Sequence, residues 1–83
     1  MKIHKLKTVE PFFSQVNSGE KRFEVRKNDR NFQTGDWVTL IPYPDNGQLP
    51  LIFEIGIILR HFEGLADGYV CFQLEEITQE ATD

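Results

Sequence analysis

Residues 51–59 read LIFEIGIIL, the longest apolar stretch of the chain, and they decide its fold class. Every second residue is apolar, which is the period of a β-strand with one face in a core. Gly56 inside the stretch indicates a bend or bulge, as barrels often need. The residues expected on the core face are Leu51, Phe53, Ile55, Ile57 and Leu59.

Four other segments are expected to be strands. They are residues 3–7, 21–27, 37–43 and a last strand that opens at Gly68 and turns Val70, Phe72 and Leu74 inward. Alternation within residues 21–27 directs Phe23 and Val25 to the core and the charged side chains to solvent. Phe32 is expected to return to the core between two turns, and the Asn46-Gly47 dipeptide favours a tight turn before residue 51.

Residues 9–18 are predicted to form a helix. Apolar residues recur at the i, i+3, i+4 and i+7 spacing of one helical face, namely Val9, Phe12, Phe13 and Val16. Thr8 suits the N-cap, and Pro11 is tolerated because amides of the first turn have no intrahelical acceptor. Gly19 fits the left-handed position just past the helix end.

Together these elements predict a mainly β (α+β) fold: a small barrel of about five strands with one N-terminal helix. Closure of the sheet would remove its exposed edges, and the helix would plug one end of the barrel. The chain of 83 residues is expected to be a single domain, 1–83, with a frayed acidic tail at residues 76–83.

Composition excludes several classes of protein. No apolar run reaches the roughly 20 residues of a membrane span, and the charged N-terminus lacks the apolar stretch of a signal peptide. Cys71 is the only cysteine, so an internal disulfide is impossible and a reducing cytoplasm is the expected compartment. Without a glycine-rich phosphate loop or nucleotide fingerprint, no cofactor is expected.

Charge is distributed unevenly along the chain. The first thirty residues hold eight of the nine Lys and Arg against four acids, a net charge of +4. The remainder holds only Arg60 against nine acids, a net charge of −8. This asymmetry suggests a one-sided electrostatic field, although scattered solvating charges would give the same count.

The densest chemical signal is residues 19–30, GEKRFEVRKNDR. Every second residue of a strand lies on the same face, so one face of the predicted strand holds Arg22, Glu24 and Arg26. There Glu24 can hold an arginine in place by a charge-assisted hydrogen bond. An arginine held in this way can bind a phosphate or the edge of a base, because little side-chain entropy remains to be lost on binding. The alternative is a solvated outer strand with weak cross-strand ion pairs.

The same segment resembles a known family. Gly19, Lys21, Glu24 and Arg26 match the G-x-K-x-x-E-x-R signature of ASCH domains, the module named after activating signal cointegrator homologs and related to the PUA fold. The flanking sequence is similar to a small bacterial and phage ASCH-like group. Its further motifs are H-x-L-K at residues 4–7, R-K-N-D-R at 26–30, F-x-x-G-D at 32–36 and G-Y-V at 68–70.

The resemblance implies a PUA-like β-barrel with a helix beside a cleft that binds RNA or a nucleotide. It implies Lys21, Glu24 and Arg26 as polar cleft residues, and His4, Asn28, Asp29 and Arg30 as the rim of the site. No membrane partner is expected, and a protein partner is not identified by the sequence.

Two other functions stay open. Some bacterial ASCH proteins are amidohydrolases acting on N4-acetylcytidine with a Lys and a Thr, and Lys21 matches that Lys. Glu24 stands where the Thr nucleophile is expected, and a carboxylate cannot perform the same step, so the interpretation leans away from an enzyme. The third possibility is a protein-interaction or regulatory domain whose acidic second half docks a partner.

The remaining chemistry-bearing residues carry weaker signals. Tyr43 and Tyr69 are candidates for stacking on bases. His4 and His61 alone make a poor metal site, because zinc takes three or four protein ligands, so no metal is expected. Cys71 is expected to be a packed, unreactive thiol.

Overall fold

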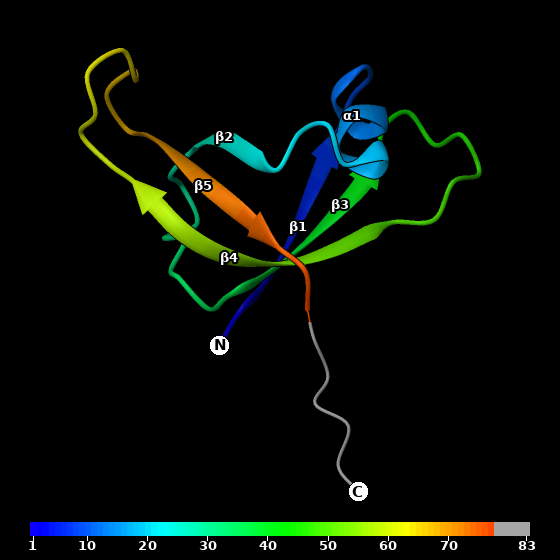
Figure 1. Cartoon of the computed structure of the whole chain (residues 1–83), viewed down its shortest axis with the longest axis horizontal. Coiled ribbons are helices and arrows are strands. Elements are labelled where there is room, and N and C mark those ends of the chain that lie inside the picture. The colour runs from blue at the N-terminus through cyan, green and yellow to red at the C-terminus, as the bar shows by residue number, and fades with distance from the viewer. Residues whose placement is uncertain (78–83) are drawn as a thin grey trace, which may run out of the picture.

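The computed structural model describes residues 1–77 (Figure 1). Its elements are β1 (Ile3–Thr8), α1 (Phe12–Ser18), β2 (Phe23–Lys27), β3 (Trp37–Pro42), β4 (Leu51–Leu59) and β5 (Tyr69–Glu75). The prediction of a mainly β chain with five strands and one early helix is confirmed. Within the described part of the chain, no helix is long and apolar enough to cross a membrane.

The five strands form one sheet in the order β1-β3-β4-β5-β2. β1 runs parallel to β3, with α1 and β2 between them in the chain, and every other pairing is antiparallel. The sheet curls into a half-barrel with α1 at the end of β1 (Figure 1). Its two edge strands, β1 and β2, lie on either side of the opening.

The core fills the concave side of this sheet. Phe32 lies at its centre, with its ring 5.0 Å from that of Phe72. The predicted inward placement of Phe32 and of the last strand's apolar residues is confirmed. The buried cluster comprises Leu6, Val16, Phe32, Val38, Leu40, Ile55, Val70, Phe72 and Leu74.

A bulge in β4 changes the face on which its residues lie. The register with β5 shifts between Ile55 and Ile58, so the predicted bend at Gly56 is confirmed. The prediction of one apolar face is wrong beyond this point, since Ile57 is 68% exposed and Leu59 is exposed. An extra residue in a strand reverses the alternation that follows it.

Helix α1 begins at Phe12 rather than at residue 9, and Thr8 is not its N-cap. Thr8 is the last residue of β1, paired with β3, and its side chain is buried. The Glu10 carboxylate takes the capping role, because it accepts from the Ser14 amide at 2.9 Å and the Ser14 hydroxyl at 2.6 Å. Gly19 ends the helix in the left-handed region, with φ of 87°, as predicted.

Only part of the predicted apolar face of the helix is buried. Phe13 and Val16 pack inward, whereas Val9 and Phe12 are each about half exposed. Of the predicted frayed tail, residues 78–83 lie outside the described residues.

Candidate functional site

The inward face of β2 is the reverse of the predicted one. Glu24 is buried, at 3% exposure, while Phe23 and Val25 are each 47% exposed. Alternation gives two faces but does not say which one is inside. Glu24 can lie inside because both of its carboxylate oxygens have cationic partners, and a paired charge is tolerated where an unpaired one is not.

Three charged residues meet at this carboxylate. Lys21 Nζ lies 2.8 Å from Glu24 Oε1, and Arg26 Nε lies 2.9 Å from Glu24 Oε2. Lys21 precedes β2, so strand alternation does not fix the direction of its side chain. Its ammonium also donates to the Phe23 carbonyl at 2.6 Å. The structure therefore brings together the predicted cleft residues Lys21, Glu24 and Arg26, here called the ion triad.

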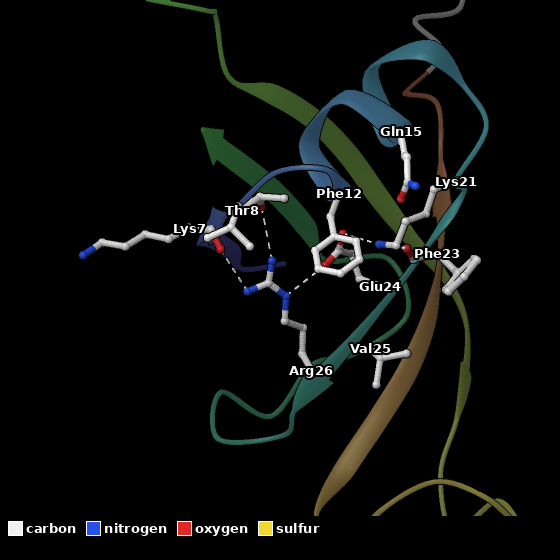
Figure 2. A pocket seen from close by; sticks show the side chains of 10 residues that line it. Lys7, Thr8, Phe12, Gln15, Lys21, Phe23, Glu24, Val25 and Arg26 are labelled. Atoms are coloured by element: carbon white, nitrogen blue, oxygen red, sulfur yellow. Dashed lines mark hydrogen bonds and ion pairs between the residues drawn. The ribbon is translucent and has the colours of Figure 1, made fainter. Parts of the chain in front are cut away.

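Arg26 also connects the two edges of the sheet. Its Nη1 donates to the Lys7 carbonyl at 3.1 Å, and its Nη2 donates to Thr8 Oγ1 at 3.2 Å, both across the opening to β1. Figure 2 shows the guanidinium between the end of β1 and Glu24. Three directional bonds hold this side chain in one orientation, which fits the predicted fixed arginine. Arg22, by contrast, reaches Glu76 at 3.5 Å and is not part of the triad.

A cavity of about 480 Å³ opens beside the ion triad. The end of β1, the start of α1 and β2 line it, and the rings of Phe12 and Phe23 border it (Figure 2). Lys21 Nζ lies 5.7 Å from the Phe12 ring centre and 5.0 Å from that of Phe23. The volume falls within the roughly 300–1,000 Å³ of small-molecule sites. This cavity, called the main cavity below, therefore places aromatic rings beside charged side chains that are held in one orientation.

The sequence interpretation missed the aromatic part of this cavity. Phe12 and Phe23 were both assigned to the core, and Gln15, which also lines the cavity, was not singled out. A signal for Phe12 was present, because adjacent helical residues point about 100° apart and Phe13 already fills the core position. No comparable signal exists for Phe23, whose placement follows from the burial of Glu24.

Comparison with known proteins assigns the chain to a family. Residues 3–74 match the model of a family described as "Domain of unknown function (DUF3850)". The chain belongs to this family. A relative in Escherichia phage P2, named "Uncharacterized 12.9 kDa protein in GpA 3'region", is 46% identical over 39 residues. That match covers 47% of this chain and 36% of the phage protein, so the chain matches about a third of its relative.

His4 of this DUF3850 domain does not lie at the cavity. It is buried in β1, where its Nε2–H donates to Asp36 Oδ2 at 2.9 Å and its ring packs edge-on against Phe32. Burial raises the pKa of Asp36. Hydrogen bonds from His4 and from the backbone amides of Lys2 and Gln33 outweigh this and hold that pKa below its ordinary value. His4 therefore joins β1 to the turn before β3.

The predicted rim residues of the turn after β2 separate into two roles. Asn28 Oδ1 accepts from the Phe32 amide at 3.1 Å and so shapes the turn. Asp29 and Arg30 are exposed and line a second, smaller cavity that Arg26 also borders. Arg30 Nη1 donates to the Lys5 carbonyl at 2.6 Å. The rim thus lies along the opening between β1 and β2.

The two tyrosines of the DUF3850 domain lie outside the main cavity. Tyr43 is exposed beside β3, where Lys7 Nζ lies 4.9 Å from its ring centre, and Tyr69 borders a separate hollow near Asn28. Cys71 is a half-buried free thiol. Among residues 1–77, no three His, Cys, Asp or Glu side chains form a cluster that could hold a metal ion.

Proposed function

We propose that this domain binds a nucleotide or a short single-stranded segment of RNA in the main cavity. One observation carries the proposal: the rings of Phe12 and Phe23 border the same cavity as the ion triad, whose Glu24 carboxylate is buried. Stacking of a base on an aromatic ring contributes about 1–3 kcal/mol in single-strand binders. An aromatic surface beside fixed cations matches a ligand that is itself an aromatic ring joined to an anion.

The ion triad supplies the polar part of this recognition. A guanidinium has five N–H donors, and Arg26 uses three of them in the contacts described. Its remaining N–H groups can reach a phosphate or a base edge. Because the side chain is already held in place, little of its conformational entropy remains to be lost on binding.

The charge around the opening favours the same class of ligand. The basic residues that line the two cavities along it are Lys7, Lys21, Arg26, Lys27 and Arg30. The acids of the second half of the sequence give the chain its net charge of −4. A local positive field can attract an anionic ligand even when the whole protein is acidic.

The resemblance to ASCH domains of the PUA-like fold supports the proposal, since its signature residues are those of the ion triad. With that resemblance we expect the protein to act in the cytoplasm, as the single cysteine also suggests.

Titration of fluorescent RNA hexamers tests the proposal. About three phosphate contacts predict that log affinity falls with log salt at a slope near −2. Phe12→Ala should weaken binding about tenfold, whereas Phe62→Ala, an exposed phenylalanine outside the cavity, should not. If neither hexamers nor the four nucleoside monophosphates bind at low salt, the proposal is wrong.

Hydrolysis of a modified nucleoside is the second candidate. It is favoured by the contact of Lys21 with Glu24 beside a cavity of suitable size. In such a reaction a carboxylate takes a proton from a water that attacks the amide carbon, and an ammonium gives a proton to the nitrogen that leaves as the C–N bond breaks. Both oxygens of Glu24 already accept hydrogen bonds from Lys21 and Arg26, so neither is free to activate a water, which places this candidate second. Release of acetate from N4-acetylcytidine, and its loss in Lys21→Ala, would make it the first.

A further inference from the structure

A second cavity, of about 180 Å³, shares Arg26 with the main one. It lies at the turn that follows β2, against the middle of β1, and the residues around it are Leu6, Arg26, Lys27, Asp29, Arg30 and Phe32. Three cations therefore surround this cavity with a single carboxylate, that of Asp29. Its apolar floor comes from the core residues Leu6 and Phe32, both buried.

Backbone carbonyls help to position both arginines at this cavity, and Arg26 is also paired with the Glu24 carboxylate. Arg30 donates through Nη1 to the Lys5 carbonyl at 2.6 Å, and Arg26 donates to the Lys7 carbonyl at 3.1 Å. A carbonyl oxygen orients a guanidinium without neutralising it. Within residues 1–77, neither Arg30 nor Lys27 has a carboxylate within ion-pair distance. The positive charge here is thus held in place and only partly compensated.

We infer that this second cavity is a phosphate site. It would bind the phosphate of the ligand whose base stacks in the main cavity, with Arg26 contacting both parts. A phosphate offers only acceptor oxygens and one to two negative charges, which match the free N–H groups of Arg26 and Arg30 and the Lys27 ammonium. The inference rests on the proposed function and specifies its ligand as phosphorylated, either a free nucleotide or an RNA backbone.

Amide and arginine side-chain NMR spectra of the whole protein test the site itself. Inorganic phosphate, added against a chloride control of equal ionic strength, should give saturable shifts confined to residues 26–30. Arg30→Ala should weaken this binding at least tenfold. Arg22→Ala, which removes an exposed arginine that pairs with Glu76, should leave it unchanged. Shifts that do not saturate, or that spread over the surface, would show adventitious binding only and overturn the inference.

Three ligands separate this inference from the proposed function. Uridine monophosphate should bind at least tenfold more tightly than uridine, and Arg30→Ala should remove that difference. A uridine trinucleotide without a terminal phosphate shows which form of phosphate the site takes. If it binds as tightly as the monophosphate, the site takes the diester of an RNA backbone. If it binds only as weakly as uridine, the site takes the monoester of a free nucleotide. Equal affinities of uridine, its monophosphate and the trinucleotide, with shifts at Phe12, would overturn the phosphate site alone. Phosphate shifts at residues 26–30 without any nucleoside or RNA effect at Phe12 would overturn the proposed function alone.

Discussion

Arg26 of β2 donates a hydrogen bond to the backbone oxygen of Lys7 in β1, at 3.1 Å across the opening of the half-barrel. Edge strands carry unpaired backbone groups that can pair with other chains. The guanidinium satisfies one of these groups while its Nε holds Glu24. The ion triad therefore joins the two sheet edges as well as lining the main cavity, so its variants should change stability and binding together.

Glu24→Gln should destabilise the protein by about 1–3 kcal/mol, the usual cost of losing charge-assisted hydrogen bonds, because the cations that remain are only partly buried. The variant leaves Lys21 and Arg26 without their shared carboxylate. Urea unfolding followed by tryptophan fluorescence measures the change. Glu20→Gln is the matched control, because Glu20 is exposed and forms no ion pair within the described chain, and it should change stability by less than about 0.5 kcal/mol. A loss below about 1 kcal/mol for Glu24→Gln would contradict the structural role of the triad.

Arg26→Lys tests whether geometry or charge joins the edges. An ammonium keeps the charge but cannot reproduce the fork that contacts Glu24, Lys7 and Thr8 at once. We expect a loss of about 1–3 kcal/mol and faster amide exchange in β1 and β2. Arg22→Lys, at an exposed arginine with one 3.5 Å contact, should have little effect. Equal exchange rates in the two variants would show that charge alone suffices.

Phe12 and Phe13 are adjacent in sequence but should respond in opposite ways. Phe13 is 1% exposed, so Phe13→Ala should cost about 3–5 kcal/mol of stability. Phe12 is 47% exposed at the cavity, so Phe12→Ala should cost much less stability and reduce binding instead. Thermal unfolding and RNA titration of both variants provide the comparison. A large stability loss in Phe12→Ala with unchanged binding would assign this ring to the core.

Local pattern predicted the elements well because it depends on neighbours in sequence. The period of residues 51–59 identified β4, and Gly19 marked the helix end. The faces predicted to be buried in β2, and in β4 after its bulge, were wrong. Which face is buried depends on contacts between residues that are distant in sequence. Burial of Glu24 rather than Phe23 follows from partners that only the folded chain supplies.

The candidate site was predicted in part for the same reason. Residue type and spacing pointed to Glu24 and Arg26 but also to Arg22, which lies outside the ion triad. Lys21 was expected only from the family signature. His4 was expected at the cleft, yet its partner Asp36 lies 32 residues away and draws it into the core. The Phe12 ring lies at the site because its neighbour Phe13 fills the core position of the helix.

The carboxyl of Asp36 should make stability depend on acid pH. Its pKa in the folded protein lies below the ordinary value of 3.8, because hydrogen bonds led by that of His4 outweigh the effect of burial. A carboxyl with a lowered folded pKa contributes fully above pH 3.8, and this contribution is lost as pH falls through the folded value. The wild type should therefore be more stable than Asp36→Asn by about 1–3 kcal/mol at about pH 5, and it should lose this extra stability as the pH falls below 3.8. Urea unfolding across this range measures the difference, with Asp67→Asn at an exposed position as the control that should follow the wild type. A difference between wild type and Asp36→Asn that stays constant with pH would show that the hydrogen bonds to Asp36 do not favour its charged form.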